Sequence, residues 1–197
     1  MGLSLDEIKQ HMVPYEGCVP HMYLDTVGKV TVAIGNLLPN VASAKALAFV
    51  LRATGAAASP AEIAGDFDAV SKQPKGLFYG KYKEHTRLDL PAGEIDALFK
   101  RRVATFEQEL RGYYPKYDAF PDKAKLAMLD MAFNLGSTGL KKSWPNLNKA
   151  IDALDWAAAA VHCIRPQAQA RRNAGTVALF EAAAKEHAQP EAHGTTV

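Results

Sequence analysis

The stretch 16–38 constrains the fold most, because it is patterned for β-structure within a sequence that otherwise favours helices. Residues 23–28, Tyr-Leu-Asp-Thr-Val-Gly, are typical of a strand that runs into a turn, since Asp and Thr side chains can bond their own backbone and glycine allows positive φ. Residues 29–35 are rich in β-branched side chains, which favour a return strand. The pattern predicts a β-hairpin that carries Asp25 on one arm and Thr31 on the other.

A helix is predicted just before this stretch. Ser4 and Glu7 match a capping box at its start, and Pro14 indicates that it ends near Glu16. The dipole at the C-terminus of a helix disfavours negative charge, so this position favours the protonated carboxyl that a general acid needs. A solvated glutamate before the helix-ending Gly17 is the alternative interpretation of Glu16.

Most of the remaining sequence predicts helices. The segment 123–134 is apolar around nearly its whole circumference, which is typical of a buried helix, and we expect it to form the core of a larger lobe. The segment 74–89 is loop-like and rich in aromatic and basic residues. We interpret it as a packed surface loop, with contact to a sugar polymer as the alternative. Further helices are expected over residues 40–53, from Ser59-Pro60 onward, from Pro91 to Gly112, over 148–163 with Val161 facing inward, and over 167–187.

Composition excludes few functions. The net charge of +2 does not by itself indicate nucleic acid binding, although it is compatible with an anionic polymer such as a cell wall. Cys18 and Cys163 lie far apart and belong to no zinc-binding pattern, so we predict two free thiols and no metal site, with a single disulfide as the less favoured alternative. The sequence has no apolar run of about 18 residues and no N-terminal apolar segment, which predicts no stable membrane insertion and no signal peptide.

Three successive motifs resemble those of the phage-type (T4-type) lysozyme family. Glu16-Gly17, residues 23–28 and residues 31–38 are similar to the patterns E-G, Y-x-D-x-x-G and T-x-G-x-G of that family, and the spacing of Glu, Asp and Thr fits without a gap. Two positions depart from the pattern: Ala33 replaces its first glycine, and Asn36 replaces the histidine that follows it.

The resemblance continues downstream. Residues 90–103 resemble the long connecting helix of the family, residues 120–136 resemble its buried helix with the F-N-x-G signature, and residues 171–174 resemble a basic motif on its last helix. The resemblance implies a mainly α (α+β) lysozyme-like fold with two lobes, in which a long helix joins a small β-hairpin lobe to a larger helical lobe. The implied catalytic domain covers residues 1–188, with the small lobe at about 16–89, the helical lobe at about 90–188 plus the N-terminal helix, and a polar tail at 189–197.

The activity that the resemblance implies is that of a muramidase, a glycoside hydrolase that cleaves the β-1,4 bond between N-acetylmuramic acid and N-acetylglucosamine in peptidoglycan. Such hydrolysis needs one protonated carboxyl for the leaving oxygen and a second group for the oxocarbenium-like charge or the attacking water. We assign Glu16 as the general acid, Asp25 as the group that stabilises charge and orients water, and Thr31 as the residue that holds the water. The candidate substrate-binding residues are Asn134, Gly35 and Leu37. No metal or other cofactor is implied.

Two alternatives without catalysis remain: a lysozyme-like module that binds peptidoglycan, and a helical interaction protein with weak affinity for anions. The expected partners are the glycan strands of peptidoglycan rather than nucleic acid, with an immunity or inhibitor protein, or a delivery protein, as further candidates. We expect synthesis in the cytoplasm and action in the periplasm or at the cell wall. Delivery by a holin would fit a phage endolysin, and delivery by a secretion system would fit a secreted antibacterial effector.

Overall fold

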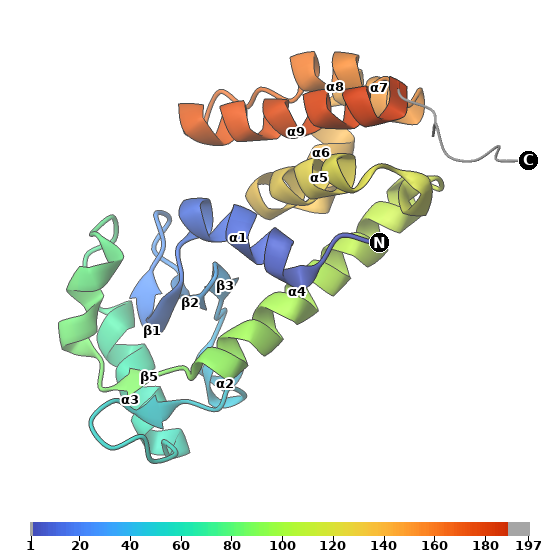
Figure 1. The fold of residues 1–197 in the computed structure, drawn as a ribbon. Coiled ribbons are helices and arrows are strands. Elements are labelled where there is room, and N and C mark those ends of the chain that lie inside the picture. The colour runs from blue at the N-terminus through green and yellow to red at the C-terminus, as the bar shows by residue number, and fades with distance from the viewer. Residues whose placement is uncertain (1, 189–197) are drawn as a thin grey trace, which may run out of the picture. The chain divides into compact units, whose positions relative to one another are not determined.

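The computed structural model describes residues 2–188, which form a mainly helical protein with a small antiparallel sheet (Figure 1). The predicted fold class is confirmed at this level, and the tail predicted from residue 189 lies outside the described residues. In chain order the elements are α1 (Leu5–Glu16), β1 (Val19–Leu24), β2 (Val30–Ala33), β3 (Asn36–Leu37), α2 (Val41–Lys45), β4 (Val50–Leu51), α3 (Pro60–Ser71), the 3₁₀ helix η1 (Tyr79–His85), β5 (Leu88–Asp89), α4 (Ala92–Tyr113), the 3₁₀ helix η2 (Tyr117–Ala119), α5 (Asp122–Leu135), α6 (Ser137–Ser143), α7 (Pro145–Asp152), α8 (Trp156–His162) and α9 (Ala170–Ala188).

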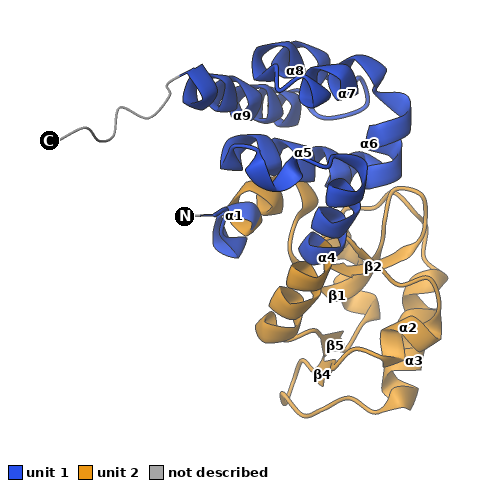
Figure 2. Ribbon diagram, turned by 90° about the vertical axis from the view of Figure 1, so that its right-hand side faces the viewer, with its two compact units in different colours: residues 1–8, 103–197 blue, residues 9–102 orange. Residues whose placement is uncertain are grey.

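The chain divides into two compact units (Figure 2). Residues 9–102 form the sheet-bearing unit, and of the remaining described residues, 2–8 together with 103–188 form the helical unit. The predicted division began the helical lobe near residue 90, whereas this division falls inside α4, whose first half belongs to the sheet-bearing unit. The N-terminal helix α1 is also shared, because its residues from Lys9 onward belong to the sheet-bearing unit.

The predicted hairpin is present and has one strand more than expected. Strands β1 and β2 pair in antiparallel fashion, with Tyr23 opposite Thr31, and β3 adds a third strand that places Leu37 on the other side of Thr31. Asp25 lies in the connecting turn, just beyond the last residue of β1. The β-branched run predicted this strand correctly, because β-branched side chains favour strands. All four residues of β2 are buried.

The capping box predicted at Ser4 is formed, and the helix predicted from Ser59-Pro60 also begins with one. The Ser4 N–H donates to Glu7 Oε2 at 2.9 Å, and the Glu7 N–H donates to Ser4 Oγ at 3.3 Å. The pKa of Glu7 is lowered because its carboxylate accepts hydrogen bonds from the Ser4 hydroxyl, at 2.7 Å, and from the Ser4 N–H. Ser59 and Glu62 make the same reciprocal pair at the start of α3, where Pro60 is the first helical residue. Sequence predicted these starts well because every partner lies within one helical turn.

The helix predicted over residues 40–53 is wrong beyond Lys45. Asn40 caps α2 as a good N-cap residue should, but the helix ends after five residues, and Val50 and Leu51 form β4 instead. This strand pairs with Leu88 and Asp89, nearly forty positions along the chain. Helix propensity differs by only a few tenths of a kcal/mol among ordinary residues, so a long-range pairing can override an alanine-rich pattern.

The helical unit is built on α5, as predicted. Eight of its residues are buried, and α9 packs along it (Figure 1). One of the eight is a carboxylate, Asp130, which lies at 0% exposure. Two side chains from the end of the chain, Arg172 and Thr176 on α9, bond to it, and so does Arg165 from the segment before α9. The basic motif at 171–174 therefore contributes Arg172 to the interior of this unit.

The prediction of a single helix over residues 148–163 is wrong, because this segment forms parts of two helices, α7 and α8. The break falls at residues 153–155, where Leu154 has a φ of +59° and Asp155 caps α8 through the N–H of Ala158. The prediction that Val161 faces inward is also wrong, since it is 70% exposed. A non-glycine residue with positive φ interrupts the helical phase, so a period counted through it assigns the wrong face.

Candidate functional site

The end of α1 sets the position of Glu16. Within the sheet-bearing unit, Met12 is fully buried on the inner face of the helix, and Lys9 pairs with Asp96 of α4. The helix ends at Glu16, and Gly17, with a φ of +74°, turns the chain into β1. Glu16 is thus held half-buried at a helix C-terminus, as predicted, with its Oε1 atom buried.

Gly35 brings bare backbone against the Glu16 carboxyl. A Cβ placed on Gly35 would lie 3.4 Å from Glu16 Oε2, and Gly35 has a φ of +63°, which side-chain-bearing residues rarely adopt. Any other residue at this position would therefore have a strained backbone, and its Cβ would contact the carboxyl. The candidate substrate-binding residue Gly35 lies directly beside the candidate acid.

Asp25 organises the hairpin turn. Its Oδ1 atom accepts hydrogen bonds from the N–H groups of Val27, at 3.0 Å, and Lys29, at 2.8 Å, and its own N–H donates to the Lys29 carbonyl. Gly28, with a φ of +88°, completes the turn. Among the described residues, both of these bonds to the Asp25 side chain end on Oδ1. The carboxylate is rigidly held and only half-buried.

A row of side chains crosses the sheet from Tyr23 through Thr31 to Leu37. These residues lie directly opposite one another in adjacent antiparallel strands, so their side chains share one face. Thr31 is only 4% exposed, and its hydroxyl donates to the Lys29 carbonyl at 3.2 Å. The Thr31 oxygen is therefore left as an acceptor, and a water at this position would have to donate to it. Leu37 is 39% exposed.

Tyr23 connects the two candidate catalytic carboxylates. The pKa of Tyr23 is raised to about 12, first by burial, then by the negative charges of Glu16 and Asp25, and then by Tyr79. Electrostatic effects of this kind fall off steeply with distance, so both carboxyl groups must lie near the same phenol. Glu16, Asp25, Thr31, Gly35 and Leu37 thus all surround one sheet within one compact unit.

Ala33, which replaces the first glycine of the T-x-G-x-G pattern, has an unusual backbone conformation. Its φ is +59°, in the left-handed region, although it is not glycine. It sits at the end of β2, opposite Val19, and is 1% exposed. The backbone therefore adopts there the conformation that a glycine would favour, and the alanine adopts it at an energetic cost of about 1–2 kcal/mol.

Asn134 belongs to the other unit. It lies in the last turn of α5 and is exposed. Gly136, with a φ of +73°, ends the helix, and its N–H donates to the Ala132 carbonyl at 2.8 Å. Asn134 is therefore not the cap of this helix, because Gly136 occupies that position.

Sequence reasoning missed Tyr23 and the aromatic pair Phe78 and Tyr79 as parts of this region. Tyr79 packs edge-on against Tyr23, with ring centroids 6.3 Å apart, and Phe78 packs on Tyr79 at 4.1 Å. The available signals were the tyrosine inside the Y-x-D motif and the density of aromatic residues in 74–89. The segment 74–89 is more ordered than a loop, because it contains η1 and β5.

Two comparisons with known proteins give the same result. A search against models of protein families and a search of curated protein sequences both find no match. Among residues 2–188, no cluster of three or more His, Cys, Asp or Glu side chains is arranged to hold a metal ion. Cys18 is an exposed free thiol and Cys163 a buried one. Within the same range, every helix is too short or too polar to cross a membrane. The assignment of a function therefore rests on the site geometry and the motif resemblance.

Proposed function

We propose that this chain is a muramidase that cleaves the β-1,4 bond between N-acetylmuramic acid and N-acetylglucosamine in peptidoglycan. The observation that carries the proposal is that the negative charges of Glu16 and Asp25 both raise the pKa of Tyr23, beside the same small sheet. One carboxyl comes from a helix end and the other from a rigid turn. The motif resemblance supports the same assignment, together with a lysozyme-like two-lobed fold in which α4 is the long connecting helix.

The proposed reaction uses the two carboxyl groups differently. Glu16, protonated, transfers its proton to the glycosidic oxygen as the C–O bond breaks. Asp25, held by two backbone N–H groups, stabilises the positive charge that develops on the sugar ring and orients the attacking water. Thr31 accepts a hydrogen bond from that water. The water oxygen bonds to the anomeric carbon, and the water gives up one proton to one of the two carboxylates. No step in this scheme requires a cofactor.

The bare backbone of Gly35 favours a bulky substrate at this site. It leaves space beside the Glu16 carboxyl that a side chain would fill. A sugar oxygen could therefore approach Glu16 from the side of the turn after β2. Leu37, partly exposed in the same row as Thr31, would offer an apolar contact to a sugar ring.

The biological setting follows from the substrate. A peptidoglycan hydrolase fits a phage endolysin released through a holin, or an antibacterial effector delivered by a secretion system. A non-catalytic peptidoglycan-binding module would keep the fold without needing Glu16 or Asp25, and it is the alternative that the experiment below tests.

The test is the muramidase activity of Glu16→Gln on purified peptidoglycan, read as new reducing ends and as muropeptides by mass spectrometry. The amide keeps the shape of the side chain but has no transferable proton, so activity should fall by about 10²–10⁴-fold, the usual contribution of a positioned acid. Circular dichroism and the melting temperature should match those of the wild type.

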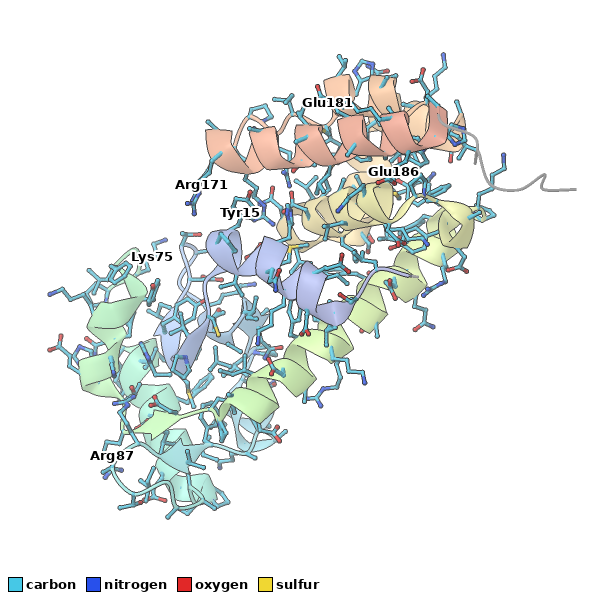
Figure 3. All side chains as sticks on the ribbon, viewed as in Figure 1. Tyr15, Lys75, Arg87, Arg171, Glu181 and Glu186 are labelled. Atoms are coloured by element: carbon cyan, nitrogen blue, oxygen red, sulfur yellow. The ribbon has the colours of Figure 1, made fainter. Side chains whose placement is uncertain are left out.

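The matched control is Glu186→Gln, which makes the same chemical change on the exposed side of α9 (Figure 3). It should leave activity unchanged. Wild-type activity in folded Glu16→Gln would remove Glu16 from the mechanism. A wild-type protein that binds peptidoglycan but releases no reducing ends would support the binding module.

A further inference from the structure

An exposed aromatic pair lies beside the candidate site. Phe78 is 67% exposed and Tyr79 is 42% exposed, at the start of η1 in the sheet-bearing unit. Large apolar side chains that gather on a surface often mark a binding site. Two adjacent exposed rings that touch each other therefore require an explanation beyond the packing of a surface loop.

The backbone beneath the two rings is firmly anchored. The Nε2–H of His21 donates to the Tyr79 carbonyl at 3.1 Å, and burial lowers the pKa of His21. Tyr82, fully buried three residues later, donates its hydroxyl to the Pro74 carbonyl at 2.8 Å. The backbone that carries the exposed rings is thus already ordered, which reduces the loss of conformational entropy on binding.

Gly80 reserves the position of the Phe78 ring. A Cβ on Gly80 would lie 3.0 Å and 3.2 Å from two carbon atoms of that ring, closer than ordinary packing allows. The ring therefore lies over the Cα of Gly80, where only glycine leaves enough space. This arrangement keeps the ring of Phe78 packed against Tyr79.

The pair is continuous with the candidate reaction centre. Tyr79 contacts the ring of Tyr23, and the hydroxyl of Tyr23 responds to the charges of Glu16 and Asp25. A polymer bound across the carboxyl groups would therefore reach the aromatic pair if it extended along β1 toward η1. The surroundings also carry positive charge, because Lys75 extends from the loop before η1 (Figure 3), and its side chain would lie 3.4 Å from a Cβ placed on Gly28 at the hairpin tip.

We propose that Phe78 and Tyr79 form an aromatic platform that binds one sugar ring of the glycan, next to the sugars held at Glu16 and Asp25. The chemistry suits a pyranose, which offers an apolar face of C–H groups to an aromatic ring and keeps its hydroxyl and acetamido groups at the edges. This inference rests on the proposed function for the identity of the polymer. It adds a subsite on an element that the family motifs do not include.

The test measures binding separately from cleavage. Glu16→Gln serves as the parent because it does not consume the polymer, and its sedimentation with insoluble peptidoglycan and with chitin gives the two affinities. Adding Phe78→Ala should weaken both by about tenfold, since chitin offers the sugar without peptides. Gly80→Ala, which displaces the Phe78 ring, should weaken binding in the same direction, whereas Val161→Ala, at an exposed apolar position of the other unit, should have no effect.

The two proposals fail in different ways. Unchanged muramidase activity in Glu16→Gln would overturn the proposed reaction, and sedimentation with chitin would still report on the platform. Equal binding of the parent and of Phe78→Ala, or no binding of the parent to either polymer, would overturn the platform. A loss on peptidoglycan with none on chitin would also overturn it, because the pair would then recognise peptide rather than sugar.

Discussion

The polar groups around Tyr23 and those around Asp130 are organised in opposite ways. Asp130 is 0% exposed, and its two oxygens accept hydrogen bonds from Arg165 at 2.8 Å, Arg172 at 2.8 Å and Thr176 at 2.6 Å. Around Tyr23 the two carboxyl groups are half-buried, and Asp25 uses one oxygen for its turn. Both oxygens of Asp130 accept hydrogen bonds from other side chains of this buried cluster, which is typical of a structural role.

The difference teaches how a site can be told from a structural cluster in a single chain. Buried charges must be fully bonded, because an unpaired charge in the interior is strongly destabilising. Groups that act on a ligand must keep hydrogen-bonding capacity and access to solvent. By this criterion Glu16 and Asp25 are candidates for chemistry, and the basic motif that includes Arg172 serves to join α5 to α9.

The largest expected effect on stability comes from Asp130→Ala. Removing the carboxylate leaves the charges of Arg165 and Arg172 buried, so the free energy of unfolding should fall by about 3–5 kcal/mol. Urea denaturation measures this loss. Asp122→Ala, at a half-buried position in the first turn of the same helix, removes an i,i+3 ion pair with Lys125, so this control should change stability by no more than about 0.5 kcal/mol. A similar small change in Asp130→Ala would contradict the structural role.

Asp25→Asn should affect activity and spare the fold. The amide oxygen can still accept from Val27 and Lys29, so the turn is kept, but the negative charge is lost, and turnover should fall by about 10²–10³-fold. Steady-state hydrolysis of peptidoglycan and thermal unfolding test the two parts. Asp25→Ala should in addition lower stability by about 1–2 kcal/mol, because it removes both bonds to the turn. Full activity in Asp25→Asn would remove the charge of Asp25 from the mechanism.

Asn134→Ala tests the proposed substrate contact in the helical unit. Because Asn134 is exposed and Gly136 ends the helix, the melting temperature should stay unchanged while the Michaelis constant rises by about five- to tenfold, corresponding to one lost hydrogen bond. Asn146→Ala, at another exposed asparagine of the same unit, should change neither quantity. A lowered melting temperature with an unchanged Michaelis constant would assign Asn134 to stability instead.

The smallest expected effect is that of Ala33→Gly. Relief of the positive φ should gain about 1–2 kcal/mol, whereas loss of a buried methyl and the greater chain entropy of glycine should together cost a similar amount. Stability should therefore change by less than about 1 kcal/mol. Ala132→Gly, at a buried position inside α5, has no strain to relieve and should cost about 2 kcal/mol. Equal losses in the two variants would contradict the strain at Ala33.

The candidate site was largely predictable because its residues occur close together in sequence. Glu16, Asp25, Thr31, Gly35 and Leu37 fall within one stretch that folds back on itself, so motif spacing was enough to group them. Tyr23 belongs to the same stretch, but its link to both carboxylates depends on geometry that spacing does not reveal. The rings of Phe78 and Tyr79 reach this region from more than fifty residues away.

What the sequence by itself determined is the local structure: the capping pairs at Ser4 and Ser59, the hairpin turn at Asp25, and the buried character of α5. Each depends on hydrogen bonds or burial patterns within a few residues. Only the tertiary structure decided that Val50 joins a strand and that Asp130 meets the end of the chain. These outcomes depend on pairings between distant segments, whose energies exceed the small local preferences that a sequence displays.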